Sequence, residues 1–193
     1  MMLKQFIKGV AMLLVMIVLT GIAYPLVVTG LAQLFFPHQA NGSLVYKNGK
    51  AVGSQLIGQN LSDPKYFQPR PSAAGTNGYD ATASGGSNLG PTNKDLLKAV
   101  ADRANTIRRQ NGLSSSQEIP SDLVTASASG LDPDITPEGA MLQVPRIAKL
   151  RNLPAATIRN LVQQDTTPRQ LGIFGEPRVN VLRLNLDLDG LTK

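Results

Sequence analysis

The chain has 193 residues, of which 42% are hydrophobic and 17% charged, and it carries a net charge of +6 with no cysteine and one histidine. The lack of cysteine excludes disulfides, thiolate metal ligands and a cysteine nucleophile. The lone His38 follows an apolar segment, which disfavours zinc and a histidine-based triad. Basic residues are scattered, and no aromatic residues interleave with them, which argues against nucleic-acid binding.

An uncharged stretch near the N-terminus predicts a membrane-spanning helix. Residues 9–36 carry no charged side chain. As an α-helix this stretch would be about 42 Å long, and roughly 20 residues suffice to cross the hydrocarbon core, so it can span a bilayer with tilt or overhang. Pro25 lies within the stretch and predicts a kink, or marks the outer third of the span.

The charges around this stretch predict its orientation. Lys4 and Lys8 precede it, and the next basic residue is Lys47. The positive-inside rule therefore places residues 1–8 in the cytoplasm and residues 37–193 in one external, periplasmic domain.

A cleavable signal peptide is the competing interpretation of the same residues. Lys4 and Lys8 would form its basic region, residues 10–20 its apolar region, and residues 21–23 a small-x-small cleavage site. The apolar run continues through residues 24–36, however, which a soluble mature N-terminus does not need. An uncleaved anchor is therefore favoured.

The external domain begins with a predicted β-hairpin and a long loop. Residues 43–47 and 50–58 flank Asn48-Gly49, the strongest short hairpin signal. Residues 60–92 are rich in Gly, Pro, Ser and Asn and have hardly any periodic pattern. Disorder is one interpretation, but Tyr66, Phe67, Tyr79 and Leu89 are spread through this stretch. These side chains favour an ordered loop packed on the domain.

Three helices and a strand are predicted after this loop. Residues 93–110 place Leu96, Val100, Ala104 and Ile107 on one face, and Asn111-Gly112 provides a left-handed stop.

Thr136-Pro137-Glu138 is typical of a helix start, and Pro145 should kink the helix that follows. A third helix is expected over residues 154–164. The alternating leucines of residues 179–188 then predict a half-buried strand with a bulge near residues 181–182. The fold class is therefore α+β behind a single transmembrane helix.

No complete catalytic motif is present in the sequence. The Gly-rich run of residues 85–92 precedes a helix, as phosphate loops do, but it lacks the Gly-Lys-Ser/Thr ending, and Pro91 has no N–H to donate. Asp132 and Asp134 are better explained as turn and cap residues, and Ser127 and Ser129 have no neighbouring base. The residues by themselves indicate an anchored external domain that is not an enzyme.

Several motifs in order carry a family resemblance. They are residues 53–59 (GSQLIGQ), 66–67 (YF), 70–73 (RPSA), 84–93 (SGGSNLGPTN), 122–133 (DLVTASASGLDP), 143–148 (QVPRIA) and 175–182 (GEPRVNVL). Together with the N-terminal anchor, they closely resemble the C subunits of bacterial Kdp potassium-transporting ATPases over nearly the whole chain.

The resemblance implies an accessory, non-catalytic subunit of the high-affinity, ATP-driven potassium uptake pump of the bacterial inner membrane. Its implied partners are a channel-like potassium-translocating subunit, a P-type ATPase subunit and a small single-helix peptide. The family has been described as a catalytic chaperone that raises the ATP affinity of the ATPase subunit. ATP and potassium would then be handled by the complex, with no cofactor or metal assigned to this chain.

Two other classes stay open at this stage. One is a freestanding, membrane-anchored extracytoplasmic binding domain. The other is an anchored extracellular enzyme, which a polar cleft joining Asp132 with Ser127 or Ser129 would support.

The motifs supply the candidate structural and interface residues, which are Gly86, Ser87, Asn88, Gly90, Pro91, Asn93, Ser129, Gly130, Asp132, Arg146 and Arg178. Four of them, Gly86, Asn88, Gly90 and Pro91, are expected to form a rigid turn into the helix that begins at Asn93. A positive φ at Gly90 would make Gly90→Val destabilising by about 1–3 kcal/mol.

Overall fold

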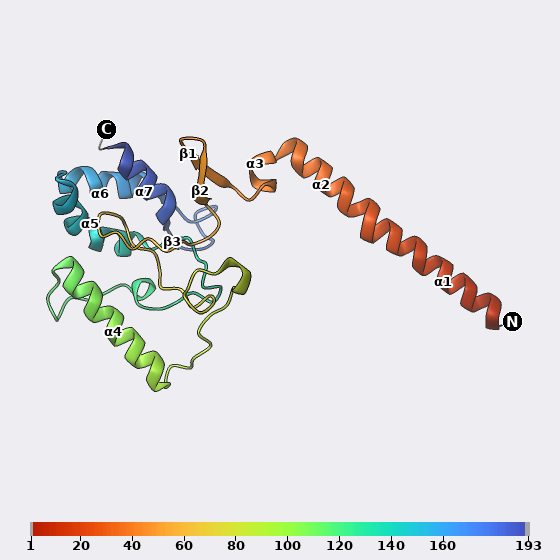
Figure 1. Cartoon of the computed structure of the whole chain (residues 1–193), viewed down its shortest axis with the longest axis horizontal. Helices are drawn as coiled ribbons and strands as arrows, with labels where there is room; N and C mark the ends of the chain where they lie inside the picture. The colour runs from red at the N-terminus through yellow and green to blue at the C-terminus, as the bar shows by residue number, and fades with distance from the viewer. Residues whose placement is uncertain (1, 192–193) are drawn as a thin grey trace. The chain divides into compact units, whose positions relative to one another are not determined.

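The computed structural model describes residues 2–191. The chain forms two compact units, Met1–Leu44 and Val45–Lys193, and each is described by itself (Figure 1).

The first unit is an apolar helix in three segments. These are α1 (Met2–Val18), a π-helical turn (Leu19–Ala23) and α2 (Tyr24–Phe35), and the short α3 (Pro37–Ala40) follows. Within the described residues, Met2–Phe35 is the one helix long and apolar enough to cross a membrane, and none of its most apolar window is buried. The predicted N-terminal apolar helix is confirmed.

The irregularity predicted from Pro25 takes the form of the π-helical turn. Pro25 lies at the start of α2, directly after the turn Leu19–Ala23. Proline has no N–H, and its ring clashes with the carbonyl group of the residue four positions earlier, here Gly21. A wider turn relieves this clash without ending the helix.

The second unit opens with the predicted hairpin. Strand β1 (Leu44–Lys47) and strand β2 (Lys50–Ser54) form a two-stranded sheet. Asn48 and Gly49 between them have φ values of 54° and 76°. Positive φ at both central residues is the requirement of the type I′ turn, which matches the twist of paired strands. The second strand ends at Ser54, earlier than predicted.

A small antiparallel sheet joins three distant parts of the domain. Its strands are β3 (Asp134–Ile135), β4 (Thr166–Thr167) and β5 (Arg178–Asn180), in the order β3-β5-β4. Val179 is the central residue of the sheet, because it is paired with Ile135 on one side and Thr166 on the other. It is fully buried.

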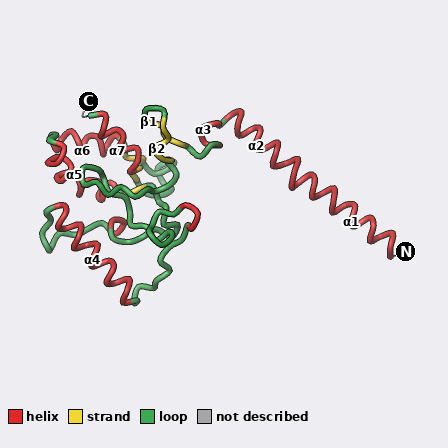
Figure 2. Tube along the Cα trace, viewed as in Figure 1, coloured by secondary structure: helices red, strands yellow, loops and turns green. Residues whose placement is uncertain are grey.

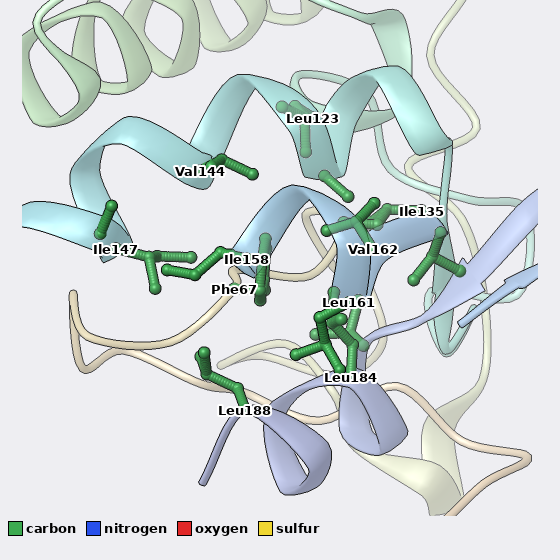
Figure 3. Packing of buried hydrophobic residues seen from close by; sticks show 14 residues of the cluster. Phe67, Leu123, Ile135, Val144, Ile147, Ile158, Leu161, Val162, Leu184 and Leu188 are labelled. Atoms are coloured by element: carbon green, nitrogen blue, oxygen red, sulfur yellow. The ribbon is translucent and has the colours of Figure 1, made fainter. Parts of the chain in front are cut away.

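Three helices enclose the hydrophobic core (Figure 3). These are α5 (Pro137–Arg151), α6 (Ala155–Gln164) and α7 (Val181–Gly190), with α6 in contact with both others. Thr136 caps α5, and its hydroxyl accepts a hydrogen bond from the Gly139 N–H. The fully buried side chains at the centre of the core are those of Phe67, Ile147, Ile158, Val162, Leu184 and Leu188.

Helix α4 (Lys94–Asn111) is packed more loosely than these three. Asn93 caps its N-terminus by accepting hydrogen bonds from Asp95 and Leu96, and Gly112 ends it in the left-handed conformation. The helix contacts α5, yet none of the residues Lys94–Asn111 is fully buried. Figure 1 shows α4 lying apart from the group formed by α5, α6 and α7. Its predicted bounds are confirmed, and its apolar face is half-buried.

The long loop of residues 60–92 is ordered, as predicted, although its described residues hold one regular element, the 3-10 turn Ala81–Ala83 (Figure 2). Phe67 and Ala74 are fully buried. The Tyr79 hydroxyl donates to the Arg70 carbonyl oxygen. Leu89 differs from the expectation, because it is exposed to solvent.

The predicted C-terminal strand is much shorter than residues 179–188. Strand β5 stops at Asn180, whose side chain caps α7 by accepting a hydrogen bond from the Arg183 N–H. The predicted bulge therefore does not exist. The buried face of α7 has helical spacing and consists of Val181, Leu184 and Leu188. The sequence did not reveal this spacing, because leucine also stands at every second position from 182 to 188 and so matches a strand pattern.

Candidate functional site

The most specific sequence motif packs against a second motif. The Ser84 hydroxyl and the Gly85 N–H both donate to the Ser129 carbonyl oxygen, at 3.0 and 2.9 Å. A Cβ on Gly86 would lie 3.2 Å from the Ala128 carbonyl oxygen. The structure therefore brings residues 84–86 against residues 127–129: Gly86 lies beside Ser127 and Ala128, and its neighbours Ser84 and Gly85 bond to Ser129.

Gly130 is the tightest point of this contact between two loops. Its φ is 65°, and a Cβ there would lie 2.6 Å from the Gly85 carbonyl oxygen and 2.7 Å from the Ala74 nitrogen. Its own carbonyl oxygen accepts a hydrogen bond of 2.6 Å from the Ser72 hydroxyl. Both the backbone conformation and the close approach require glycine.

The predicted turn into α4 is only partly confirmed. Asn93 caps the helix, and its N–H donates to the Gly90 carbonyl oxygen at 3.0 Å. Gly90 does not have a positive φ, and nothing lies within 4 Å of the position its Cβ would take. The condition for the Gly90→Val prediction, a positive φ at Gly90, is therefore not met, and the basis for a destabilising Gly90→Val is removed. The left-handed residue in this stretch is Asn88, with φ 53°.

The other residues of this stretch are exposed. Ser87, Asn88, Gly90 and Pro91 all face solvent. They follow Gly86 but do not line the contact that Gly86 makes.

An ionic cavity lies beside the small sheet. It has a volume of about 250 Å³ and is lined by Arg70, Asp122, Asp132, Asp134, Ile135, Thr136, Glu176, Pro177 and Arg178. Two candidate residues, Asp132 and Arg178, meet here without pairing directly. Asp132 pairs with Arg70 at 2.8 Å, and Arg178 pairs with Asp134 at 3.0 Å. Both pairs are partly exposed, so they orient the side chains more than they stabilise the fold.

The environment of Asp134 perturbs its ionisation. Burial raises the pKa of Asp134 above its ordinary value, and the neighbouring Asp132 carboxylate raises it further. The hydrogen bond from Asn180 and the charge of Arg178 oppose these effects. The net result is a pKa above that of an ordinary aspartate, so Asp134 takes up a proton at a higher pH than a free aspartate does.

Asp122, also at this cavity, stabilises the start of α5. It is 7% exposed, and its Oδ2 accepts a hydrogen bond of 2.6 Å from the Thr136 N–H. A carboxylate at this position complements the helix dipole. Its Oδ1 is buried and has no hydrogen-bond partner within residues 2–191.

Arg146 does not line this cavity and binds another part of the domain. It is 8% exposed, and its guanidinium donates to the carbonyl oxygens of Pro64 and Tyr66 and to the side chains of Asn111 and Gln143. Burial lowers the pKa of Arg146. Because backbone carbonyls supply several of its acceptors, Arg146 fixes the loop of residues 60–92 to α5.

Two sets of side-chain hydrogen bonds, made by Asn185 and Asp189, were not predicted from the sequence. The Asn185 side chain accepts from the Phe67 N–H at 2.8 Å and donates to the Phe67 carbonyl oxygen at 3.0 Å. Asp189 accepts hydrogen bonds from Lys47, Tyr66 and Arg151. The only available signal in the sequence was the placement of these two polar residues near the terminal leucines. The strand interpretation assigned Asn185 to the polar face, and Asp189 lies beyond the predicted strand of residues 179–188.

The site combines a contact between two loops with a cavity lined by charged side chains. Four carboxylates and two guanidinium groups line the cavity, which suits a basic group of a ligand or partner. Within residues 2–191, no group of three or more His, Cys, Asp or Glu could hold a metal ion. Ser127 and Ser129 hydrogen-bond one another at 3.3 Å and do not line the cavity that holds Asp132.

An exposed apolar helix followed by one α+β domain is the architecture of a single-pass membrane protein. Comparison with known proteins gives the family. The family model described as "K+-transporting ATPase, c chain" (KdpC) matches residues 6–190. The chain is 56% identical to a potassium-transporting ATPase KdpC subunit of Gemmatimonas aurantiaca over 99% of this chain and 95% of that protein.

Further relatives agree. The corresponding subunit of Acidobacterium capsulatum is 59% identical over 89% of this chain and 90% of its own length. That of Mycobacterium tuberculosis is 53% identical over 97% of this chain and 99% of its own length. The chain belongs to the KdpC family and is an accessory subunit of the potassium-transporting Kdp ATPase complex. This assignment displaces the alternative of a freestanding binding domain.

Proposed function

We propose that this chain is a non-catalytic docking subunit, anchored in the bacterial inner membrane with residues 1–8 in the cytoplasm and residues 37–193 outside. The observation that carries the proposal is that no residue in the most apolar window of the helix Met2–Phe35 is buried. Such a surface needs lipid or the helices of a partner to cover it. Its two charges, Lys4 and Lys8, lie at the end assigned to the cytoplasm.

The proposed partners are the channel-like subunit, near the outer mouth of its ion path, and through it the P-type ATPase subunit, with a small single-helix peptide as a further member. The helix does not line an ion path itself, because residues 9–36 offer no ionisable side chain, the usual mark of such a path. The chain would therefore act by covering partner surface and restraining conformation.

The candidate residues fit a rigid docking scaffold. The contact of residues 84–86 with residues 127–130 fixes one loop against another, and the pairs at Asp132 and Arg178 orient charged groups around the cavity. The anionic balance of the cavity suits a basic side chain of a partner. The net charge of +6 disfavours a potassium-attracting funnel unless acidic residues cluster at the mouth of the ion path. Asp132 and Asp134 line this cavity, whereas Asp63 and Asp80 do not.

The effect on ATP affinity that the family resemblance implies would be indirect. An external domain is separated by the membrane from cytoplasmic ATP. We therefore assign the chaperone role to conformational coupling within the complex, with the nucleotide held by the ATPase subunit.

A topology experiment tests the orientation. Alkaline phosphatase fused after the last residue is expected to be active, since this enzyme needs the periplasm. The mature chain should retain its first residue. An inactive fusion, or a mature N-terminus at Tyr24, would contradict the proposed anchor.

An anchor exchange tests the docking role. Residues 9–36 are replaced by an unrelated single-pass helix, and assembly and ATPase activity of the whole complex are measured. If the external domain carries the main contact, activity survives with weaker subunit binding; if the native helix does, the complex dissociates. Cross-links from the external domain to cytoplasmic ATPase segments alone would refute docking on the outer side.

A further inference from the structure

One loop of the α+β domain keeps its apolar side chains outside. Residues 168–177 connect β4 to β5, and at the tip of this loop Leu171 is 89% exposed, Ile173 69% and Phe174 59%. We call residues 170–174 the apolar tip. Other large apolar side chains nearby in sequence, such as Val179 and Leu184, are fully buried.

The apolar tip has a defined backbone. Gln170 and Phe174 form a β-bridge in which each N–H donates to the other residue's carbonyl oxygen, at 2.8 and 2.9 Å. The Ile173 N–H also donates to the Gln170 carbonyl oxygen at 3.2 Å. A loop closed in this way is already ordered before it meets a partner, which lowers the entropic cost of binding.

Leu171 occupies a conformation that leucine disfavours. Leu171 and Gly172 have φ values of 53° and 77°, almost the values of Asn48 and Gly49 in the turn between β1 and β2. Asparagine and glycine suit such a turn, whereas the left-handed conformation costs a residue with a large Cβ substituent. A strained leucine that packs against nothing does not serve the fold, so its side chain indicates a contact outside the domain.

The charges beside the apolar tip favour a protein partner over a lipid surface. Arg169 and Glu176 flank the tip and pair with one another at 2.5 Å, and Arg178 pairs with Asp134. The loop therefore presents no unpaired cation to anionic headgroups and lacks the electrostatic attraction that adds to apolar insertion at a membrane. Small apolar anchors of this kind fill pockets at the centre of protein interfaces.

We infer that the apolar tip inserts Leu171, Ile173 and Phe174 into an apolar pocket on another subunit of the same complex. This inference rests on the proposed docking function. It adds a particular contact, made by the β4–β5 loop, to the contacts of the membrane helix and of the ionic cavity.

Affinity measurements test the tip. Full-length chain, wild type or variant, is titrated in detergent into the complex prepared without it, and binding is measured directly. Leu171→Asn and Phe174→Ala are expected to bind about 10–100-fold more weakly than wild type, the effect of losing a central apolar anchor. Leu97→Gln is the matched control, because Leu97 is an exposed leucine on α4 (57%), and it should bind as wild type does.

The outcomes separate this inference from the proposed function. Failure of the wild-type chain to bind would overturn the docking function. Normal wild-type binding with unchanged Leu171→Asn and Phe174→Ala would overturn the tip contact alone.

A photo-crosslinking amino acid at position 171 of the assembled complex identifies the occupant. An adduct with another protein subunit is expected. An adduct with lipid only, or no adduct, would contradict insertion into a protein pocket.

Discussion

Two loops of the domain carry aromatic side chains and use them in opposite ways. In the loop of residues 60–92, Phe67 is fully buried at the centre of the core, whereas in the loop of residues 168–177, Phe174 is 59% exposed. Figure 3 shows Phe67 beside Ile158, among side chains of the core helices. One loop is therefore part of the folding core, and the other presents its apolar side chains to solvent.

The difference lies in what the backbone of each loop binds. Both backbone groups of Phe67 are satisfied by the Asn185 amide on α7, so the loop is held against the core helices. The bonds of the apolar tip are local, between Gln170 and Phe174, and leave its side chains without a surface to cover. Buried polar pairing directs a loop inward, and local pairing lets it project.

The largest expected difference in folding stability is between variants that remove Phe67 and Phe174. Phe67→Ala should lower the free energy of unfolding by about 3–5 kcal/mol, because it leaves a cavity among the core helices. Phe174→Ala should change it by less than about 0.5 kcal/mol, as for most exposed positions. Denaturation of the full chain in mild detergent, followed by circular dichroism, measures both. Similar losses for the two variants would contradict the division of roles.

Two glycines of similar φ, Gly130 and Gly175, allow the same comparison of folding stability at a second pair of positions. A Cβ on Gly130 (φ 65°) would overlap the backbone of Ala74 and Gly85. Gly175 (φ 74°) lies in the loop of residues 168–177, here called the projecting loop, and nothing lies within 4 Å of its Cβ position. Gly130→Ala should cost about 2–4 kcal/mol, since strain and overlap add, and Gly175→Ala about 1 kcal/mol, from strain alone. Equal losses of unfolding free energy in the same denaturation experiment would show that the backbone around Gly130 can move to accommodate a Cβ without a further loss of stability.

Local signals in the sequence predicted much of this architecture. Asn48-Gly49 gave the hairpin, Asn93 and Gly112 bounded α4, and Thr136 began α5, because each of these signals acts on its own neighbours in the chain. The order of the long loop was also predicted from its aromatic residues.

Signals that depend on distant partners were not predictable. The pairing of Asn185 with Phe67 spans the domain, and the terminal leucines fit a strand pattern until the cap at Asn180 and the buried stripe of α7 are seen. The positive φ considered for Gly90 occurs in this stretch at Asn88 instead. The candidate residues separated into a loop contact, an ionic cavity and the Arg146 network, because sequence order does not reveal which motifs meet.

A smaller, pH-dependent effect distinguishes Asp189 on α7, which binds the loop of residues 60–92 through Tyr66, from Glu176 in the loop of residues 168–177. Burial of Asp189 would raise its pKa, but hydrogen bonds from Lys47, Arg151 and Tyr66 outweigh this and hold the pKa below the ordinary value of 3.8. The stability from Asp189 is therefore present above pH about 4 and is lost as pH falls through the lowered pKa. Asp189→Asn should cost about 1–2 kcal/mol at neutral pH and less in acid.

Glu176→Gln is the control for this measurement. Glu176 pairs with Arg169 in the projecting loop, and its side chain is 74% exposed. An exposed pair of this kind contributes little, so this variant should match wild type at every pH. A pH dependence in Asp189→Asn identical to that of wild type would show that the cluster at Asp189 does not contribute to acid sensitivity.

The smallest effect is a gain in stability from Leu171→Asn. The turns at Asn48-Gly49 and Leu171-Gly172 have φ values within a few degrees of each other, so the two first positions can be exchanged as a reciprocal pair. Leu171→Asn should raise the free energy of unfolding by about 0.5–1 kcal/mol by relieving left-handed strain, and Asn48→Leu should lower it by a similar amount. Because both positions are exposed, packing changes little in either variant.

A loss of stability in Leu171→Asn would mean that leucine supports the fold at the tip, and the strained conformation would then no longer indicate a contact outside the domain. A gain in folding stability combined with weaker binding to the complex would separate the two roles of this residue in one substitution.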